Sequence, residues 1–364
     1  MNFVIIGLVG ISLMGFFLLS FYPNLGGKIS EDKIRSFNQS PNFKENKFVN
    51  QIPTSINTDA NSLYTTLRDY LKDSPQRNPD KSLPIVAVDP ASLQDTKETK
   101  VTWLGHSTIL LQIDGKRILL DPVFSQSPSP FPFLGPKRYS ETLPIEIEEL
   151  PSIDVVILSH DHYDHLDYES IMKLKDKVRQ FYVPLGIGSH LERWGIEKTR
   201  IKEQDWWTEA EFEGLQLVST PARHFSGRSL FDRDATLWSS WVIIGKSARI
   251  YFSGDSGYGP HFAQIGKTYG PFDLTLMECG QYDERWSAIH MMPEETVQAH
   301  IDVNGRIMVP IHWAAFTLAL HDWTEPIERV ISAGQERQIL ISTPKIGESV
   351  VIGSEVYPNS TWWR

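Results

Sequence analysis

The sequence predicts an α/β fold for the larger part of the chain. Short apolar runs of three to five residues, typical of buried strands, recur from about residue 99 onward. Segments with helical spacing lie between the later runs, and several runs are followed closely by a histidine or an aspartate. Residues that follow the carboxyl ends of neighbouring strands gather at one edge of a sheet. We therefore expect a polar site at that edge.

The composition is that of an acidic protein with a large core. The chain has 364 residues, enough for one large domain or two ordinary ones, and 41% of them are hydrophobic. The formal net charge is −10, and no basic stripe is present, which argues against nucleic acid as the main partner. Cys279 is the single cysteine, so no internal disulfide can form. Eleven tryptophans and 18 phenylalanines could supply an aromatic surface for an apolar substrate.

The chain begins with an apolar segment. Residues 3–22 carry no charge, and twenty helical residues at about 1.5 Å each span roughly 30 Å, the thickness of a bilayer core. A cleaved signal peptide is the alternative, but it would need a basic start and small residues at the cleavage site, and neither is present. We expect residues 1–22 to be an uncleaved, single-pass membrane anchor.

The side of the membrane stays open. Lys28, Lys33 and Arg35 follow the apolar segment and would keep that side in the cytoplasm by the positive-inside rule. N-terminal anchors of bacterial enzymes nevertheless often display the enzyme outside. Residues 23–95 look like a connector, or an arm packed on the domain. Within them, leucines at a spacing of four predict one amphipathic helix at 62–72.

The regular part of the chain opens with strands at 101–104, 109–113 and 118–120. Asp114-Gly115, between the last two, is typical of a hairpin turn. Later strands are expected at 154–158, 215–219, 249–252 and 307–311. Helices are expected at 168–178, 262–269 and 293–303, the last with proline at its first turn.

The most informative motif lies directly after the strand at 154–158. His160, His162, Asp164 and His165 fall within six positions. Alternate residues of an extended loop point the same way, so His160 and His162 can bind one metal ion. Asp164 and His165 lie a step further on and can reach a second. Imidazole and carboxylate ligands without thiolate suit zinc, with iron or manganese as poorer alternatives.

Three further ligand-type residues follow later strands: His224, Asp255 and His312. Alone, each would be an ordinary turn residue or hydrogen-bond partner. Together, at one edge of the predicted sheet and beside the motif, they predict further metal ligands. Glycines flanking Asp255 permit a tight turn that aims its carboxylate inward. A two-metal site needs such a bridging aspartate, because it holds two cations close despite their repulsion.

The ordered set of these seven residues resembles the metallo-β-lactamase fold superfamily, and the resemblance runs from about residue 99 to 352. It implies a four-layer αββα sandwich with the metals at the sheet edge between the halves. Together with the apolar segment, this divides the chain into an anchor (1–22), a connector (23–95), a catalytic domain (96–352) and a C-terminal tail (353–364).

Within the superfamily, the sequence is similar to the N-acyl-phosphatidylethanolamine-hydrolysing phospholipase D group. The matching stretches are spread along the domain: 101–108, 135–138, 159–168, 205–207, 270–273 and 311–313. The N-terminal apolar segment departs from the animal enzymes, which attach to membranes peripherally, and residues 279–286 follow the animal pattern only in part. The resemblance implies phospholipid as substrate and a membrane as partner, with the exact lipid left open.

The resemblance also implies how the metals are held and used. One zinc would be bound by His160, His162 and His224, and the other by Asp164, His165 and His312, with Asp255 bridging. A water between two dications loses its proton near neutral pH, and the resulting bridging hydroxide can attack phosphorus. The catalytic residues are then Asp164, which can orient the hydroxide, and Asp255.

Substrate contacts are expected from Tyr163 and His290. Tyr163 lies inside the metal motif without being a ligand, so its ring and hydroxyl should face the cleft. His290 precedes a helix and belongs to the pocket by resemblance. His106 is expected to support the fold near the metals. Five tryptophans could line an acyl groove or pack in the core: Trp206, Trp207, Trp238, Trp241 and Trp286.

Three functions remain as interpretations. The first is a membrane-anchored, dinuclear-zinc phosphodiesterase of phospholipase D type that acts on N-acyl-phosphatidylethanolamine or a related phospholipid. The second is a metal-dependent lactonase or other ester hydrolase acting on a soluble phosphorylated sugar. The third, a metal-stabilised binding protein, is weak because all seven ligands are present. An apolar mouth over the metals would favour the lipid, and a small pocket with basic residues would favour the sugar.

Overall fold

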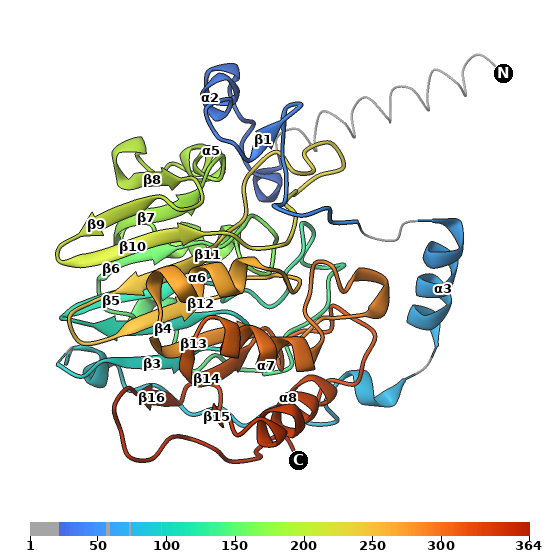
Figure 1. The fold of residues 1–364 in the computed structure, drawn as a ribbon, viewed down its shortest axis with the longest axis vertical. Helices are drawn as coiled ribbons and strands as arrows, with labels where there is room; N and C mark the ends of the chain where they lie inside the picture. The colour runs from blue at the N-terminus through green and yellow to red at the C-terminus, as the bar shows by residue number, and fades with distance from the viewer. Residues whose placement is uncertain (1–21, 56–58, 73, 96) are drawn as a thin grey trace.

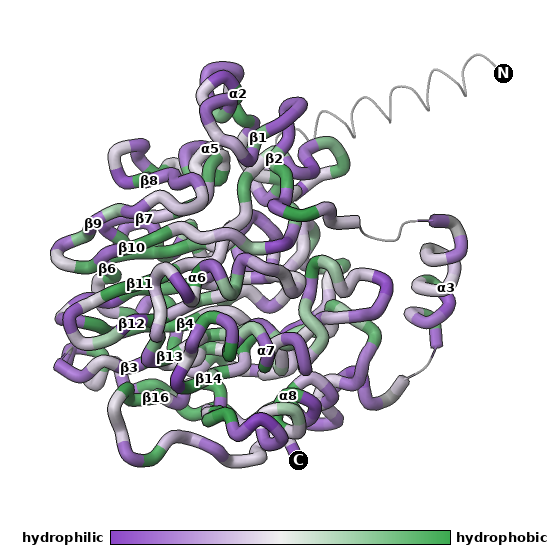
Figure 2. The backbone as a smooth tube through the Cα atoms, viewed as in Figure 1, coloured by the Kyte–Doolittle hydropathy of each residue, from purple (hydrophilic) through white to green (hydrophobic). Residues whose placement is uncertain are grey.

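The protein folds as a layered α/β sandwich. The structure is a computed structural model that describes residues 22–364 apart from 56–58, 73 and 96. Two seven-stranded sheets pack face to face, and helices cover their outer faces (Figure 1). The strands are largely apolar along their length, whereas the outer surfaces of the molecule are mostly hydrophilic (Figure 2). This arrangement confirms the predicted α/β fold and its four-layer order.

The first sheet comes mainly from the N-terminal half of the domain. Its order is β16-β3-β4-β5-β6-β7-β8. Pairing is antiparallel from β16 to β5 and parallel from β5 to β8. The strands are β3 (Lys100–Trp103), β4 (Ile109–Ile113), β5 (Lys116–Leu120), β6 (Ile153–Ile157), β7 (Val178–Pro184), β8 (Ile201–Gln204) and β16 (Ser349–Val351).

The second sheet has the order β15-β14-β13-β12-β11-β10-β9. It is antiparallel from β9 to β12 and parallel from β12 to β15. The strands are β9 (Glu209–Phe212), β10 (Leu215–Thr220), β11 (Ser240–Ile244), β12 (Arg249–Phe252), β13 (Phe272–Glu278), β14 (Gly305–Ile311) and β15 (Leu340–Ile341).

The described helices complete the two outer layers and the N-terminal arm. Helices α4 and α5 lie on the first sheet, and α6, α7 and α8 on the second (Figure 1). Helices α2 and α3 belong to the arm, together with a small hairpin. The bounds are α2 (Glu31–Phe37), α3 (Ala60–Leu71), α4 (Tyr168–Leu174), α5 (Gly188–Arg193), α6 (His261–Tyr269), α7 (Pro293–Asp302), α8 (Glu325–Glu336), β1 (Phe43–Lys44) and β2 (Lys47–Phe48).

Strand residues alternate between two apolar layers. Ile109 and Leu111 of β4 pack between the sheets, whereas Leu110 packs under the outer helices, and all three are fully buried. The same alternation holds in β6, where Val155 faces the second sheet and Val156 the helices. A sheet that is buried on both faces explains why these strands are continuous apolar runs.

Several predicted elements are confirmed with small shifts, and one helix is corrected. The predicted hairpin turn holds, since Asp114 and Gly115 both have positive φ, at 48° and 81°. The helix expected at 168–178 ends at Leu174. The reason is that Val178 is β-branched and starts β7, where it pairs with Ile153 of β6.

Residues at both ends of the described chain pack on the domain. Phe37, Phe43 and Phe48 of the arm form one buried cluster with Trp206 and Trp238. The predicted helix at 62–72 is present as α3, which stands apart from the sheets (Figure 1). Two of its leucines are exposed, Leu67 by 58% and Leu71 by 73%. The arm therefore includes a packed part and a projecting part.

The tail at 353–364 also contacts the core. The ring of Trp362 stacks on Trp313 at 5.3 Å, and Trp363 is 5% exposed. At the other end of the chain, the predicted anchor at 1–22 lies outside the described residues except for Tyr22. None of the described helices is both long enough and apolar enough to cross a membrane.

Candidate metal centre

The predicted ligands gather at one edge of the sandwich. His160 follows β6 in the first sheet, while His224, Asp255 and His312 follow β10, β12 and β14 in the second. The carboxyl ends of these strands meet, so ligand-type residues that are far apart in the sequence come close together. The structure brings all seven predicted ligands together in groups that could hold a metal ion.

Three histidine nitrogens form the first cluster. His162 Nδ1 lies 2.9 Å from His160 Nε2 and 3.2 Å from His224 Nε2. His224 Nδ1 donates to the carbonyl of Ile289 at 2.9 Å, so the proton is on Nδ1 and Nε2 keeps its lone pair. Burial and the neighbouring imidazoles hold the pKa of His160 and of His224 well below the usual value. Neutral rings with lone pairs that converge are suited to a cation.

The second cluster adds carboxylates. Asp164 Oδ2 lies 3.4 Å from both His165 Nε2 and His312 Nε2. Burial alone would lower the pKa of His312, but the carboxylates of Asp255 and Asp164 outweigh it and raise that pKa to about 9. Two buried carboxylates thus attract a positive charge at this point of the site.

Asp255 lies between the clusters. Its Oδ2 is 3.1 Å from His165 Nε2, and 3.8 and 3.9 Å from His160 Nε2 and His224 Nε2. Its other oxygen is 2.5 Å from His312 Nδ1. This is the position that a bridging carboxylate needs, because one side chain faces both sets of ligands.

The donor atoms fit a bound divalent metal. Among the described residues, the buried atoms without a hydrogen-bond partner include His165 Nε2 and His312 Nε2. Buried polar atoms without partners are costly, and a bound metal ion would supply a partner for both of these nitrogens. The set holds nitrogen and carboxylate oxygen without thiolate, as hydrolytic metal sites do.

Asp121 was not predicted, yet it supports the second cluster. It follows β5, is fully buried, and its Oδ2 lies 2.7 Å from His165 Nδ1. Its other oxygen accepts from the backbone N–H of Ser159 at 2.7 Å. A carboxylate on one ring nitrogen turns the other nitrogen toward the metal. Asp121 follows the predicted strand at 118–120, so the rule that found Asp255 could have found it too.

His106 lies beside the site, as expected. Its Nε2 is 2.9 Å from Asp164 Oδ2, and its backbone adopts a positive φ of 52°. Its carbonyl accepts from the backbone N–H of His312 at 3.0 Å. His106 therefore connects the first sheet to a predicted ligand at the end of β14.

Tyr163 does not face the cleft as expected. Its hydroxyl donates to the carbonyl of Arg228 at 2.5 Å, and the Arg228 guanidinium lies 4.1 Å from its ring centre. The hydrogen bond and the cation–π contact turn the side chain toward the loop after β10. Tyr163 accordingly is not among the residues that line the cavity at the metal ligands.

That cavity has a volume of about 310 Å³ and opens over the two clusters. Its polar floor includes Asp164 and Asp255, and the predicted contact residue His290 is in its wall. The full lining is His162, Asp164, Phe225, Asp255, Gln281, Trp286, Ile289, His290, His312 and Leu318. Of the five tryptophans considered for an acyl groove, Trp286 alone is in this lining, while Trp206, Trp238 and Trp241 are buried in the core.

Glu278 is a further residue that the sequence did not reveal. It ends β13 and is fully buried next to His290, with 3.6 Å between Glu278 Oε1 and His290 Nδ1. Burial raises its pKa, and the neighbouring His290 opposes that change. Nothing in the run at 272–278 separates this glutamate from an ordinary strand-end residue, because its burial depends on the fold.

Comparison with known proteins agrees with this geometry. Residues 116–313 match the family model of the beta-lactamase superfamily domain. An uncharacterised protein of Mycobacterium tuberculosis is 42% identical over 90% of this chain and 88% of its own length. An N-acyl-phosphatidylethanolamine-hydrolyzing phospholipase D 1 of Caenorhabditis elegans is 33% identical over 72% of this chain and 78% of its own.

Among solved structures, a metallo hydrolase of the archaeon Ignicoccus hospitalis shares the fold. Its TM-score is 0.53 at 21% identity, over 71% of this chain and 100% of that chain. At that identity the likeness concerns the fold, while the sequence relatives carry the assignment to a family. The chain is a metal-dependent hydrolase of the metallo-β-lactamase superfamily and belongs to its N-acyl-phosphatidylethanolamine-hydrolysing phospholipase D-like group.

Proposed function

We propose that the protein is a membrane-anchored phosphodiesterase of phospholipase D type, which uses two zinc ions to cleave N-acyl-phosphatidylethanolamine or a related phospholipid. The observation that carries the proposal is the wall of the cavity above the predicted ligands. Phe225, Trp286, Ile289 and Leu318 are apolar, and within the described part of the chain no lysine or arginine lines it. Such a wall suits acyl chains, whereas a phosphorylated sugar would favour basic residues.

The residues would divide the work as their positions indicate. One metal would be held by His160, His162 and His224. The other would be held by Asp164, His165 and His312, and Asp255 would face both. Two bound dications would supply a deprotonated water near neutral pH and positive charge for the phosphoryl oxygens. His224 and His165 are each fixed through Nδ1, by a carbonyl and by Asp121, so their Nε2 atoms stay directed at the centre.

Asp164 borders the cavity and has 13% of its side chain exposed. It is placed to hold the proton side of the attacking water and so orient its lone pair toward phosphorus. Attack at phosphorus forms a new P–O bond and breaks the bond to the head-group oxygen, which takes up a proton as it leaves. Phe225 and Trp286 exclude bulk water from the apolar side of the cavity.

A second set of residues supports a membrane as partner. Phe133, Leu134, Leu230 and Phe231, the apolar loop tips, are between 74% and 93% exposed. Tyr22, the first described residue after the predicted anchor, stacks on Phe131 with 5.2 Å between ring centres. Exposed apolar groups of this size beside the entry of an apolar segment suit insertion into a bilayer.

The chain just after Tyr22 also contacts the loop that carries Leu230 and Phe231. Arg228 Nε donates to the carbonyl of Asn24 at 3.0 Å, and Asn24 Nδ2 donates to the carbonyl of Pro130 at 3.0 Å. The two loops that carry the apolar loop tips are therefore joined through Asn24. An anchor at 1–22 would hold both loops at the surface of the same bilayer.

The test is to incubate the purified, zinc-loaded protein with vesicles that contain N-acyl-phosphatidylethanolamine. We expect N-acylethanolamine and phosphatidic acid in equal amounts, measured by mass spectrometry, and loss of both with a chelator. Intact phospholipid, together with chelator-sensitive hydrolysis of a soluble lactone or sugar-phosphate ester, would establish the alternative lactonase or ester hydrolase instead.

A further inference from the structure

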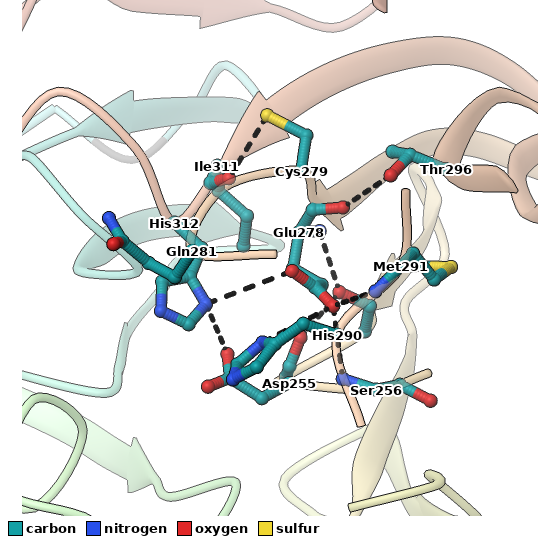
Figure 3. A network of polar contacts seen from close by, with 12 residues as sticks. Asp255, Ser256, Glu278, Cys279, Gln281, His290, Met291, Thr296, Ile311 and His312 are labelled. Carbon is teal, nitrogen blue, oxygen red and sulfur yellow. Dashed lines mark hydrogen bonds and ion pairs between the residues drawn. The ribbon is translucent and has the colours of Figure 1, made fainter. Parts of the chain in front are cut away.

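Glu278 joins the loops on both sides of the site. Its Oε1 accepts from the backbone N–H of Met291 at 2.9 Å and from that of Ser256 at 3.4 Å (Figure 3). Met291 follows His290, and Ser256 follows Asp255. One buried oxygen therefore fixes the chain next to the bridging carboxylate and next to the imidazole in the cavity wall.

The carboxylate of Glu278 also lies close to two histidine side chains. Within the described chain, Glu278 Oε2 and His290 Nδ1 are both buried and lack hydrogen-bond partners. His290 Nδ1 is 3.6 Å from Glu278 Oε1, and His312 Nδ1 is 4.0 Å from Glu278 Oε2. A movement of a few tenths of an ångström would form an N–H···O bond from His290 Nδ1 to Glu278 Oε1, which would satisfy the buried nitrogen.

The His290 ring has a defined place above the centre. It lies between the ring of His224, at 5.0 Å, and the ring of His312, at 5.3 Å, one from each cluster. The two nitrogens of an imidazole lie on different edges of the ring. If Nδ1–H is held by Glu278, Nε2 is left as a hydrogen-bond acceptor for a group in the cavity.

We propose that Glu278 is a positioning residue that fixes the tautomer and orientation of His290 and thereby presents His290 Nε2 as an acceptor inside the cavity. The inference rests on the proposed function for what enters the cavity. A phosphodiester anion has no hydrogen to donate, so the partner of Nε2 is a donor. That donor is either the attacking water, which would affect kcat, or an N–H or O–H of the head group, which would affect KM.

A double-mutant cycle tests the link between the two residues. Glu278→Gln keeps an oxygen for Met291 and Ser256, but it removes the negative charge that attracts the Nδ1–H of His290 and places an NH₂ donor at the second position. We expect the variant to lower kcat/KM by about 10–100-fold, the range seen when a hydrogen-bond partner of a site residue is removed. Its metal content should not change. The double variant with His290→Asn should be no slower than His290→Asn alone, within about twofold.

Thr296→Val is the matched control, because Thr296 Oγ1 donates at 2.9 Å to the backbone carbonyl of Glu278 and not to its carboxylate. It should keep activity within about twofold. If the effects of Glu278→Gln and His290→Asn multiply, or if Glu278→Gln is as active as the wild type, Glu278 does not act through His290 and the proposal fails.

A second measurement does not depend on turnover. Nitrogen-15 NMR of the zinc-loaded wild type, with the His290 signals identified by their loss in His290→Asn, should show the proton on Nδ1. A proton on Nε2 would overturn the proposal even if Glu278→Gln does not fold. The expected tautomer in a protein that leaves phospholipid intact would refute the proposed lipid activity and leave the role of Glu278 standing.

Discussion

Asp255 lies between the two clusters. Its carboxylate faces His165 at 3.1 Å and His160 at 3.8 Å, so its negative charge lies between two predicted cations. Asp255→Asn keeps the shape and removes the charge. We expect one metal to be lost and turnover to fall about 10²–10³-fold, as for other losses of a group that stabilises charge. Elemental analysis and kinetic assays of the same sample measure both effects.

Asp176→Asn provides the control, because it makes the same chemical change at an exposed turn after α4. It should keep full metal content and activity. Near-normal turnover of Asp255→Asn with two metals bound would show that Asp255 serves only the turn.

Asp121 accepts from the predicted ligand His165 and so supports the second cluster. In Asp121→Asn, the amide could donate to His165 Nδ1 instead of accepting from it, which would favour the wrong tautomer at Nε2. We expect metal affinity at the second cluster to fall about 10–100-fold, while the first cluster is largely unaffected. Titration with a competing chelator separates the two sites. Equal weakening of both metals would contradict the assignment of His165 to one of them.

The predictability of single residues depends on whether their signal is local. His160, His162 and Asp164 could be placed at the site from the sequence, because their close spacing and the strand before them are both visible within a few residues. Glu278 could not, because its importance comes from complete burial beside a histidine twelve residues away. Tyr163 was placed in the cleft by its position in the motif, but a contact with Arg228, 65 residues further on, turns it away.

The apolar loop tips lie outside the sheets and are the surface that we expect to contact the membrane. The apolar loop tips should each contribute on insertion, since burying a large apolar side chain stabilises by about 1.5–3 kcal/mol. In protein that lacks the anchor, replacing all four by serine should weaken binding to phospholipid vesicles at least about tenfold. Hydrolysis of a small soluble phosphodiester should not change. Vesicle sedimentation and a chromogenic assay measure the two quantities.

Val356→Ser is the matched control, because Val356 is 78% exposed in the C-terminal tail. It should leave vesicle binding unchanged. Equal binding by the serine variant of the apolar loop tips would move the membrane contact elsewhere, for example to α3 with its exposed Leu67 and Leu71.

The tail contributes to stability. Trp363 is 5% exposed, packs edge-on against Trp313 and donates from Nε1 to Glu328 at 2.7 Å. Trp363→Ala should lower the free energy of unfolding by about 3–5 kcal/mol, the range for large aromatic residues in a core. Urea denaturation measures it, with Val356→Ala as a control expected to stay within about 0.5 kcal/mol. A small effect for Trp363→Ala would show that the tail is not part of the cooperative fold.

Elements with strong local patterns were predictable, and elements set by pairing were not. The strands at 109–113 and 154–158 are continuous apolar runs, and α7 begins with a proline. Strand β7 was hidden because Val178 continued an apparent helix, and only its pairing with Ile153 shows the strand. Strand β13 begins after a cis Gly270–Pro271 bond, in a stretch that carried no clear alternation.

The two sheets each supply part of one site. His160 and Asp164 come from the first sheet, and His224, Asp255 and His312 from the second. The site therefore exists only when the sheets are packed together. We therefore expect that a segment outside the sandwich can be removed without loss of the centre, provided that the remaining chain keeps the contacts that hold the sheets together.

The same condition applies to residues 1–21. Their deletion should leave metal binding and cleavage of a soluble phosphodiester intact, because the chain from Tyr22 onward supplies the contacts with the domain. The rate on bilayer lipid should fall, since an anchor raises the local concentration of substrate. Deleting 1–27 instead also removes the carbonyl of Asn24 that accepts from buried Arg228, and the N–H of Gly27 that donates to His190 Nδ1.

The longer deletion should therefore be less stable than the shorter one in thermal unfolding, although both lack the same apolar segment. An insoluble or metal-free protein after deletion of 1–21 would show that the apolar segment belongs to the folded core. Unchanged turnover of bilayer lipid by that protein would place membrane binding on other surfaces, first of all the apolar loop tips. In that case the anchor would be dispensable for catalysis at the membrane, and Phe133, Leu134, Leu230 and Phe231 would become the residues to replace next.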